Sequence, residues 1–320
     1  MAKTSVGVLL PTRELAMTGN YEMAPLLDFA QQAEAIGFDS VWTGDSLIAR
    51  ARLDPFIVLA GVAAVTNRVR LGTAALTAAL RQPLIGANMV ASLDHASRGR
   101  LELALGSGFP IPETEQEFTA AGVPFGQRVG RADETVRLWR QAWQLHHDPS
   151  VGGSFTGRYW QVDGLDRLPP PATPRGPRLW LAGSNAPRAM ERTARLYDGW
   201  LPFLPNAELY AQAWKRIKAL AKEAGRKQQD ITPGMYATVT VNSDRERAKA
   251  ELEDYLMRYY GRPLAVMSTV QAYGYGTAEE CAEWLAGYVK AGARHLVIRV
   301  GSMDPGPQLK EIAEAVRAAV

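Results

Sequence analysis

Short polar segments rich in glycine, serine and threonine follow several apolar runs of this chain. The clearest are Thr43-Gly44-Asp45-Ser46, Gly106-Ser107-Gly108 and Gly183-Ser184-Asn185. Glycine at such positions lets a ligand or a neighbouring loop approach the backbone closely. Asp45 is the only acidic side chain among these segments, and none of them contains histidine or cysteine. The pattern therefore favours a ligand held by backbone and hydroxyl groups over a metal ion.

The segment Gly183-Ser184-Asn185 precedes a helical pattern and could hold an anion. Ser184 or Asn185 is a natural N-cap, and Pro187 fits the first helical turn. A helix start offers free N–H groups and the positive end of the helix dipole. An ordinary capped loop is the alternative. By contrast, Gly106-Ser107-Gly108 does not open a dinucleotide fingerprint, because Ile111 replaces the third glycine and Pro110 and Pro112 interrupt the required helix.

Eight apolar runs alternate with amphipathic helical patterns and must position these segments. The first four runs begin about 30 residues apart and are apolar on both faces, which is typical of a parallel sheet covered by helices. An open doubly wound sheet is the alternative, but eight units favour closure. The predicted strands cover 5–10, 39–43, 69–76, 101–105, 178–182, 199–203, 234–241 and 295–300. The predicted helices cover 22–36, 55–65, 84–94, 128–146, 187–196, 207–224, 245–255, 278–290 and 308–320.

We therefore predict an α/β fold, a TIM (β/α)8 barrel that forms a single domain over 1–320. Surface insertions follow strand four, at 149–177, and strand seven, at 258–275. The segment 109–127 is expected to be a loop. In this fold the site lies at the carboxyl ends of the strands, where the three polar segments come together.

Composition excludes several classes of function. The net charge of +3 is interspersed along the chain, which gives no nucleic-acid stripe and no polybasic membrane patch. No apolar window is long enough to span a membrane, and the first residues do not form a signal peptide. Cys281 is the only cysteine, lies among acidic neighbours and is expected to be unreactive. We expect a cytoplasmic protein. The four histidines are expected to be structural, with His295 at the opposite mouth of the barrel.

Five stretches of the chain resemble the bacterial-luciferase-like superfamily. They are AEAIGFDSVWTGDS, TNRVRLGTAAL, LDHASRGRLELALGSGFP, FGQRVGRADETVRLWRQAW and PRLWLAGSNAPRAMERTARLYDGW, at 33–46, 66–76, 93–110, 125–143 and 177–200. That superfamily includes reductases and dehydrogenases that use coenzyme F420, and monooxygenases that use flavin. The resemblance implies FMN or F420 as the cofactor, and the sequence does not separate the two.

The resemblance also implies roles for particular residues. A non-prolyl cis peptide behind the cofactor ring would fall at Ala74–Ala75, with Thr43 beside it. Gly106, Ser107 and Gly108 would border the ring, and Gly183, Ser184 and Asn185 would receive the cofactor's phosphate. Asp45 and Ser46 are the catalytic candidates near the reactive face, with Trp42 as a supporting wall. The tail of F420 could meet Arg13, Arg50, Arg52 or Arg81, which a solvated loop would also show.

Two departures from the superfamily limit the chemistry. Ser46 stands where many F420 enzymes have histidine, and Phe109 stands where sugar-phosphate dehydrogenases have glutamate. We therefore expect an oxidoreductase or monooxygenase that acts on a small organic substrate by hydride transfer or oxygen activation, because the cofactor carries the difficult chemistry. The alternatives are a cofactor-binding protein without turnover and a barrel isomerase or aldolase. Expected partners are a separate flavin or F420 reductase and a second copy of the chain. Tyr259, Tyr260, Tyr273 and Tyr275 could form a lid, a core satellite or a dimer contact.

Overall fold

Eight parallel strands close into a barrel in the computed structural model, which describes residues 3–320. The first two residues of the predicted domain lie outside the described part. The strands follow the order β9-β11-β1-β2-β3-β4-β7-β8, and β8 pairs back onto β9. This closed barrel confirms the predicted TIM fold. The strands are β1 (Ser5–Leu9), β2 (Ser40–Thr43), β3 (Arg70–Leu76), β4 (Leu101–Leu105), β7 (Arg178–Leu181), β8 (Gly199–Trp200), β9 (Thr232–Val241) and β11 (His295–Val300).

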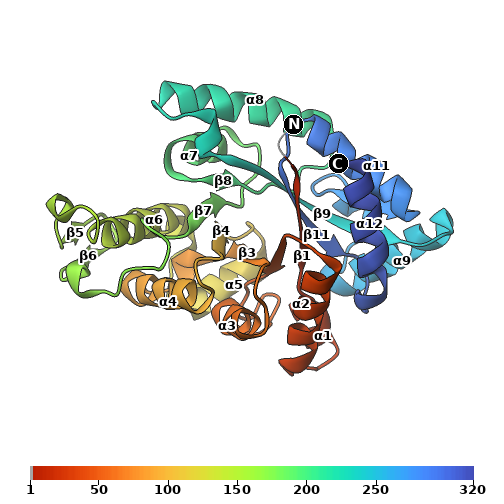
Figure 1. Cartoon of the computed structure of the whole chain (residues 1–320), viewed down its shortest axis with the longest axis horizontal. Coiled ribbons are helices and arrows are strands. Elements are labelled where there is room, and N and C mark those ends of the chain that lie inside the picture. Colours follow the sequence, from red (N-terminus) through yellow and green to blue (C-terminus); the bar gives the residue numbers. More distant parts are fainter. Residues whose placement is uncertain (1–2) are drawn as a thin grey trace.

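Helices surround the strands on the outside of the barrel (Figure 1). They are α1 (Thr12–Met17), α2 (Ala24–Ile36), α3 (Pro55–Val65), α4 (Pro83–Ala96), α5 (Pro112–Ala120), α6 (Arg128–Gln144), α7 (Pro187–Leu196), α8 (Ala207–Glu223), α9 (Arg245–Tyr260), α10 (Leu264–Met267), α11 (Ala278–Lys290) and α12 (Leu309–Ala319). No helix within 3–320 is long and apolar enough to cross a lipid bilayer.

Local signals at the helix ends explain why most predicted bounds agree with the structure. Asp54 caps α3 by accepting a hydrogen bond from Phe56 N at 2.8 Å. Thr277 and Glu280 form a capping box at the start of α11. Gly37 ends α2 with a left-handed φ of 97°, a conformation that costs glycine little.

The first insertion leaves α6 and returns to β7 through a two-stranded hairpin. Its strands are β5 (Phe155–Thr156) and β6 (Gln161–Val162). Glu134 of α6 accepts hydrogen bonds from the backbone N–H groups of Arg158, Tyr159 and Trp160 at 2.7–2.8 Å. The hairpin is therefore fastened to the outside of α6, as predicted for a surface insertion (Figure 1).

Three segments differ from the prediction. Residues 12–17, for which no helix was predicted, form α1. The segment 109–127, expected to be a loop, contains α5 and a 3-10 turn at Phe125–Gln127. Pro112 occupies the first turn of α5, where a missing N–H is tolerated. The second insertion contains α10 and a further strand, β10 (Tyr273–Gly276), which pairs in parallel with residues 238–241 of β9. β10 thus continues the sheet where the short β8 has ended.

Aromatic side chains fill the inside of the barrel. The rings of Trp42 and Trp180 lie 5.5 Å apart, and each meets the His295 ring edge-on at 5.4 and 5.2 Å. Glycine on a neighbouring strand makes room for them, since a Cβ on Gly72 would lie 2.2 Å from Trp42. Trp42, expected to be a wall beside the cofactor ring, lies within this interior layer instead.

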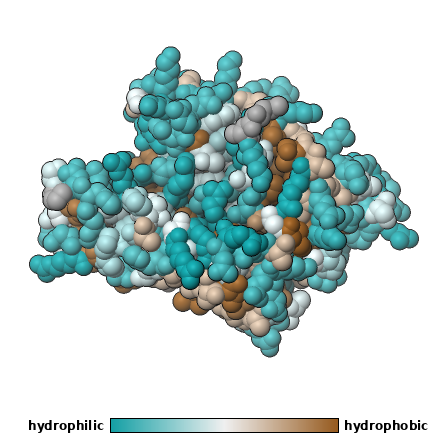
Figure 2. Space-filling view, viewed as in Figure 1, coloured by the Kyte–Doolittle hydropathy of each residue, from teal (hydrophilic) through white to brown (hydrophobic). Residues whose placement is uncertain are grey.

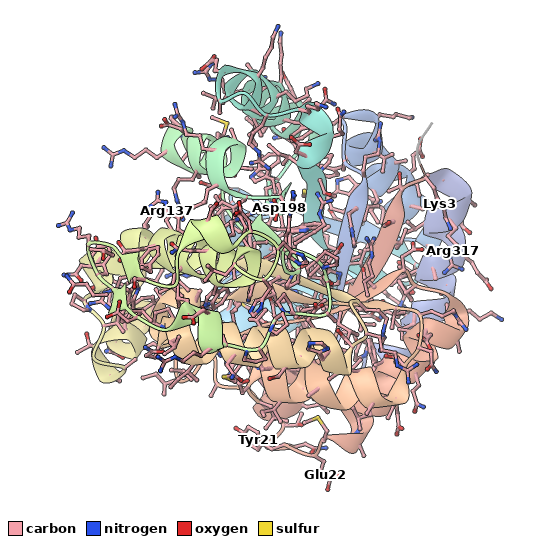
Figure 3. All side chains as sticks on the ribbon, turned by 60° about the vertical axis from the view of Figure 1, so that its left-hand side comes forward. Lys3, Tyr21, Glu22, Arg137, Asp198 and Arg317 are labelled. Carbon is pink, nitrogen blue, oxygen red and sulfur yellow. The ribbon has the colours of Figure 1, made fainter. Side chains whose placement is uncertain are left out.

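A carboxylate fixes α6 against the amino end of β7. Asp198 accepts hydrogen bonds from Arg140 at 2.9 Å and from Leu179 N at 3.0 Å. Asp198, between α7 and β8, is partly buried, whereas Arg137 of α6 is exposed (Figure 3). These contacts hold the barrel from the side opposite the strand carboxyl ends.

Candidate active site

A cavity of about 390 Å³ opens at the carboxyl ends of the barrel strands. It brings together most of the residues that the sequence nominated from segments far apart in the chain. Those that line it are Asp45, Ser46, Ala74, Ala75, Gly106, Ser107, Gly108, Gly183 and Ser184. The predicted meeting of these segments at one mouth of the barrel is therefore observed.

Two nominated residues do not line the cavity. Thr43 is fully buried, and its hydroxyl lies 3.4 Å from the carbonyl oxygen of Gly44. Asn185 is exposed at the start of the loop that enters α7. Neither side chain is placed to touch a ligand in the cavity.

One wall of the cavity is apolar and carries only small side chains. It is formed by Ala74 and Ala75 at the end of β3 and by Gly106 after β4. The Ala74–Ala75 peptide bond is cis, as the resemblance implied, and the register between β3 and β4 shifts there. A Cβ on Gly106 would stand 3.2 Å from the Cβ of Ala75, so any larger residue would project from this wall.

The carboxylate of Asp45 is fully engaged by its surroundings. Its Oδ2 accepts from Thr77 N at 2.8 Å and from Arg81, and its Oδ1 accepts from Arg81 at 3.1 Å. The Asp45 side chain is only 3% exposed. Arg81 also pairs with Asp54 at 2.8 Å. Asp45 therefore fixes the loops after β2 and β3, and both of its oxygens already accept hydrogen bonds.

Ser46 belongs to a second closed network, centred on Glu117 of α5. The Ser46 hydroxyl donates to Glu117 Oε1 at 2.8 Å and accepts from Arg50 N at 2.8 Å. The same Oε1 accepts from the backbone N–H groups of residues 47–49. Glu117 lines the cavity and is buried, and sequence reasoning missed it because α5 was expected to be a loop.

The start of α7 faces the cavity through Gly183, Ser184 and Ala189. The predicted cap is wrong by one or two residues: the N-cap is Ala186, which has no side chain able to accept from the first N–H groups. Ser184 Oγ accepts only from Ala186 N, at 3.3 Å. Pro187 occupies the first turn as predicted. An uncapped helix start beside a cavity suits an anion, which can accept from those N–H groups.

Five arginines line the cavity, of which only Arg50 and Arg52 were named from the sequence. They are Arg50, Arg52, Arg128, Arg192 and Arg299. Arg192 is neutralised by Asp133, with two contacts of 2.7 Å. The lining acids, Asp45 and Glu117, are engaged as described above. Of the arginines named for an F420 tail, Arg50 and Arg52 line the cavity, whereas Arg81 is paired and Arg13 is not among the lining residues.

The late insertion supplies part of the opposite wall. Tyr259 and Tyr260 line the cavity together with Gln271, whereas Tyr273 stands behind and donates to Gln271 Oε1 at 2.8 Å. Tyr275 packs on Arg245 at 4.9 Å, away from the cavity. The four tyrosines thus divide between the cavity wall and its support.

Arg299 of β11 also lines the cavity. Its only signal in the sequence was a positive charge inside the strand HLVIRV.

Comparison with known proteins identifies the family. The model of the family described as luciferase-like monooxygenase matches residues 4–295. A phthiodiolone/phenolphthiodiolone dimycocerosates ketoreductase of Mycobacterium bovis is 26% identical over 254 residues, 71% of this chain and 63% of that protein. A 5,10-methylenetetrahydromethanopterin reductase of Methanolobus tindarius is 27% identical over 73% of this chain and 68% of its own length. The chain thus spans less than two thirds of the ketoreductase.

Solved structures share the fold over the whole chain. An F420-dependent secondary alcohol dehydrogenase superposes with a TM-score of 0.80 at 20% identity, covering 99% of both chains. The monooxygenase RslO1 from Streptomyces bottropensis gives a TM-score of 0.79 at 22% identity, with 99% and 98% covered. Since the family model covers most of the sequence, the chain belongs to the luciferase-like monooxygenase family.

Proposed function

We propose that this chain is an oxidoreductase that binds FMN or coenzyme F420 in the cavity and acts on a small organic substrate. The observation that carries the proposal is that the small residues Ala74, Ala75 and Gly106 line the same cavity as the uncapped start of α7. A planar ring fits against a wall without projecting side chains, and an anionic tail fits a helix start. Family membership supports the same cofactors.

When bound, such a cofactor supplies the hydride transfer or the oxygen chemistry. The residues of this chain would then bind, orient and exclude water. Ala74, Ala75, Gly106, Ser107 and Gly108 would border the ring, and Gly183 and Ser184 would face its phosphate. Thr43 and Asn185 have no direct part in this arrangement.

Asp45 and Ser46 stay our candidates near the reacting atoms, in a positioning role. Both oxygens of Asp45 are held by Arg81, and the single hydroxyl proton of Ser46 is donated to Glu117. Both acids that line the described cavity already accept hydrogen bonds, Asp45 on its two oxygens and Glu117 on Oε1. Proton abstraction from an alcohol would have to use Glu117 Oε2, since a general base must accept a proton from the substrate.

A titration tests cofactor binding. The pure protein is titrated with FMN and F420, each oxidised and reduced, by isothermal calorimetry. We expect one of the two to bind with a Kd below about 10 μM, a value ordinary for a specific small-molecule site. Failure of all four titrations would remove the proposal.

Binding without turnover is the second candidate, favoured by the hydrogen bonds that both acids of the described cavity already accept. The loaded protein is mixed with a panel of ketones, aldehydes and aromatic substrates while cofactor absorbance is followed. Substrate-dependent oxidation of the reduced cofactor supports the enzyme. A tight complex that is inert to the whole panel supports the binding protein.

We also propose a homodimer and a cytoplasmic location. Ile57 of α3 and Ile85 of α4 are each about 60% exposed, and their helices pack side by side. Figure 2 shows hydrophobic surface along the lower edge of the molecule, where α3 and α4 lie.

The proposed cytoplasmic location rests on Cys281, the single cysteine of the sequence. Burial raises the pKa of Cys281 to about 12, so this lone thiol is unreactive. A separate reductase would supply reduced cofactor.

A further inference from the structure

Positive charge is concentrated at the end of the cavity formed by β11 and the late insertion. Arg299 of β11 is 2% exposed and lines the cavity. Its Nη1 donates to the Tyr260 hydroxyl at 2.9 Å, and its Nε and Nη2 donate to Thr238 Oγ1 at 3.0 and 2.8 Å. All of these partners are neutral, and Arg299 forms no salt bridge within residues 3–320. A buried cation without a counter-ion is costly.

Aromatic rings surround this guanidinium without neutralising it. The Arg299 Cζ atom lies 4.6 Å from the ring centroid of Tyr259 and 5.2 Å from that of Tyr260. Burial holds the pKa of Tyr236 and Tyr255 well above its usual value, so these phenols remain uncharged. Cation–π contacts partly replace the lost hydration, but the net positive charge remains.

Two further cations reach the same place. Arg52 donates to Tyr259 Oη at 3.4 Å and to the carbonyl of Arg50 at 3.1 Å. The Arg50 guanidinium lies 5.0 Å from the ring centroid of Tyr260. Gly44 makes room for Arg52, since a Cβ there would stand 2.3 Å from its Nη1. Neither arginine forms a salt bridge with the described residues.

One acid lies nearby, behind the cavity wall. Glu14 of α1 is 3% exposed, is not among the lining residues, and accepts a hydrogen bond from Tyr255 Oη. Its second oxygen has no hydrogen-bond partner. This one acid stands against the three arginines, and Arg13 also lies at this end, with its Cζ 6.0 Å from the Tyr259 ring centroid, so this end of the cavity remains positive.

We propose that Arg299, Arg52 and Arg50 form a subsite that binds a carboxylate group of the organic substrate, with the Tyr259 hydroxyl as a further donor and Tyr260 holding Arg299 in place. This inference rests on the proposed function, since it leaves the Ala74–Gly106 wall and the start of α7 to the cofactor. A planar guanidinium matches the two oxygens of a carboxylate. We name these five residues the arginine subsite.

Gln271 fixes the direction of the hydrogen bonds in the arginine subsite. Its Oε1 accepts from Tyr273 at 2.8 Å and from Tyr260 at 3.4 Å. The Tyr260 oxygen thus donates toward Gln271 and accepts from Arg299. The Gln271 side chain lines the cavity, and its amide nitrogen is available as one more donor to an anion.

The test compares a carboxylate with its neutral isostere. Phenylacetate and phenylacetamide are titrated by calorimetry into the protein, with and without the cofactor that it binds. We expect phenylacetate to bind at least about tenfold more tightly than the amide, as for a hydrogen bond to a charged group. Arg52→Gln should remove most of this preference, and Tyr259→Phe, which removes the free hydroxyl donor, should lower it. They complement Arg299→Met, whose buried site could impair folding.

Arg137→Gln is the matched control. It changes the net charge by the same one unit as Arg52→Gln, at an exposed position of α6 (Figure 3), and should leave both titrations unchanged. Equal affinity of the wild-type protein for acid and amide would overturn the subsite. So would an Arg52→Gln protein that keeps the preference for phenylacetate but binds FMN or F420 more weakly, because the cations would then serve the cofactor.

The two proposals can fail separately. A protein that binds neither cofactor but retains arginine-dependent binding of phenylacetate would leave the subsite standing and remove the proposed function. A protein that binds a cofactor tightly but does not distinguish phenylacetate from phenylacetamide would support the proposed function and remove the arginine subsite.

Discussion

A single carboxylate oxygen organises the segment that follows β2. Glu117 Oε1 accepts from the Ser46 hydroxyl and from three successive backbone N–H groups, 47–49. Several N–H groups converging on one anion form a strong and specific contact. Ser46 therefore owes its orientation to α5, 71 residues away in the sequence.

Replacing Ser46 by alanine should lower the rate more than it lowers cofactor affinity. The change removes one hydrogen bond to Glu117 and one from Arg50 N, so the loop shifts while the Ala74–Gly106 wall stays in place. A rise of about 1 kcal/mol in the activation free energy, from the misplaced loop, corresponds to a roughly fivefold fall in kcat. Steady-state kinetics and a cofactor titration on the same preparation check this. Equal kcat in both proteins would reject the role.

His295 should make the protein sensitive to acid. Burial, with a smaller contribution from Arg70, lowers the pKa of His295 from 6.5 to about 3. The unfolded chain therefore binds a proton that the folded chain does not, and stability is lost as the pH falls from about 6.5 towards 3. Between pH 7 and pH 5 the loss is about 2 kcal/mol.

Urea unfolding at the two pH values measures this loss. His295→Gln should show a smaller difference between pH 7 and pH 5, although its stability at pH 7 is lower. An unchanged difference would assign the acid sensitivity to other groups. His147→Gln, which changes an exposed histidine far from the barrel interior, is the reference and should leave the difference unchanged.

Among the elements, the pairing of β3 with β4 determines the position of the Ala74–Gly106 wall of the cavity. Gly106→Val would place a branched side chain against Ala75, where even a Cβ already stands at 3.2 Å. The added methyl groups would occupy the space of a planar ligand. We expect cofactor affinity to fall at least about tenfold, which is about 1.4 kcal/mol. Ser107→Ala, beside it, should have a smaller effect. Tight cofactor binding by Gly106→Val would contradict the assignment of this wall.

Strands and long helices could be predicted because their signals are local. The run Leu101–Leu105 and the helix Pro187–Leu196 agree with the structure at both ends. Each is bounded by proline, glycine or charged residues, and each has its own hydrophobic period. The number and order of the predicted strands and helices then favoured closure into a barrel. Gly106 and Gly183 were placed at the carboxyl ends of its strands on that basis.

The rest depends on contacts between distant parts of the chain. The carboxylate of Glu117 and the guanidinium of Arg299 gain their roles only from partners tens of residues away. Helix α5 has a low hydrophobic signal, and strand β10 alternates glycine with tyrosine. Such segments form a helix or a strand because of contacts with neighbouring elements. The hydrophobic periodicity of the sequence does not reveal these contacts.

At the scale of the whole molecule, Ile57→Asp should weaken the proposed dimer. A charge in the centre of a contact between copies must lose water without gaining a partner. We expect the mass from light scattering to fall from that of two chains to that of one at micromolar concentration. Val266→Asp, at another exposed apolar position on α10, is the control and should leave the mass unchanged. A wild-type monomer would contradict the dimer.

The tryptophan pair inside the barrel gives the protein an optical property. Trp42 and Trp180 pack in one cluster with Leu9, Ala74, Ala182 and Leu201, which also line the cavity. A coloured tricyclic ligand on that lining would lie within one side-chain layer of two indoles and would take up their excited-state energy. Ultraviolet emission thus becomes a built-in reporter of occupancy that works whether or not any reaction follows.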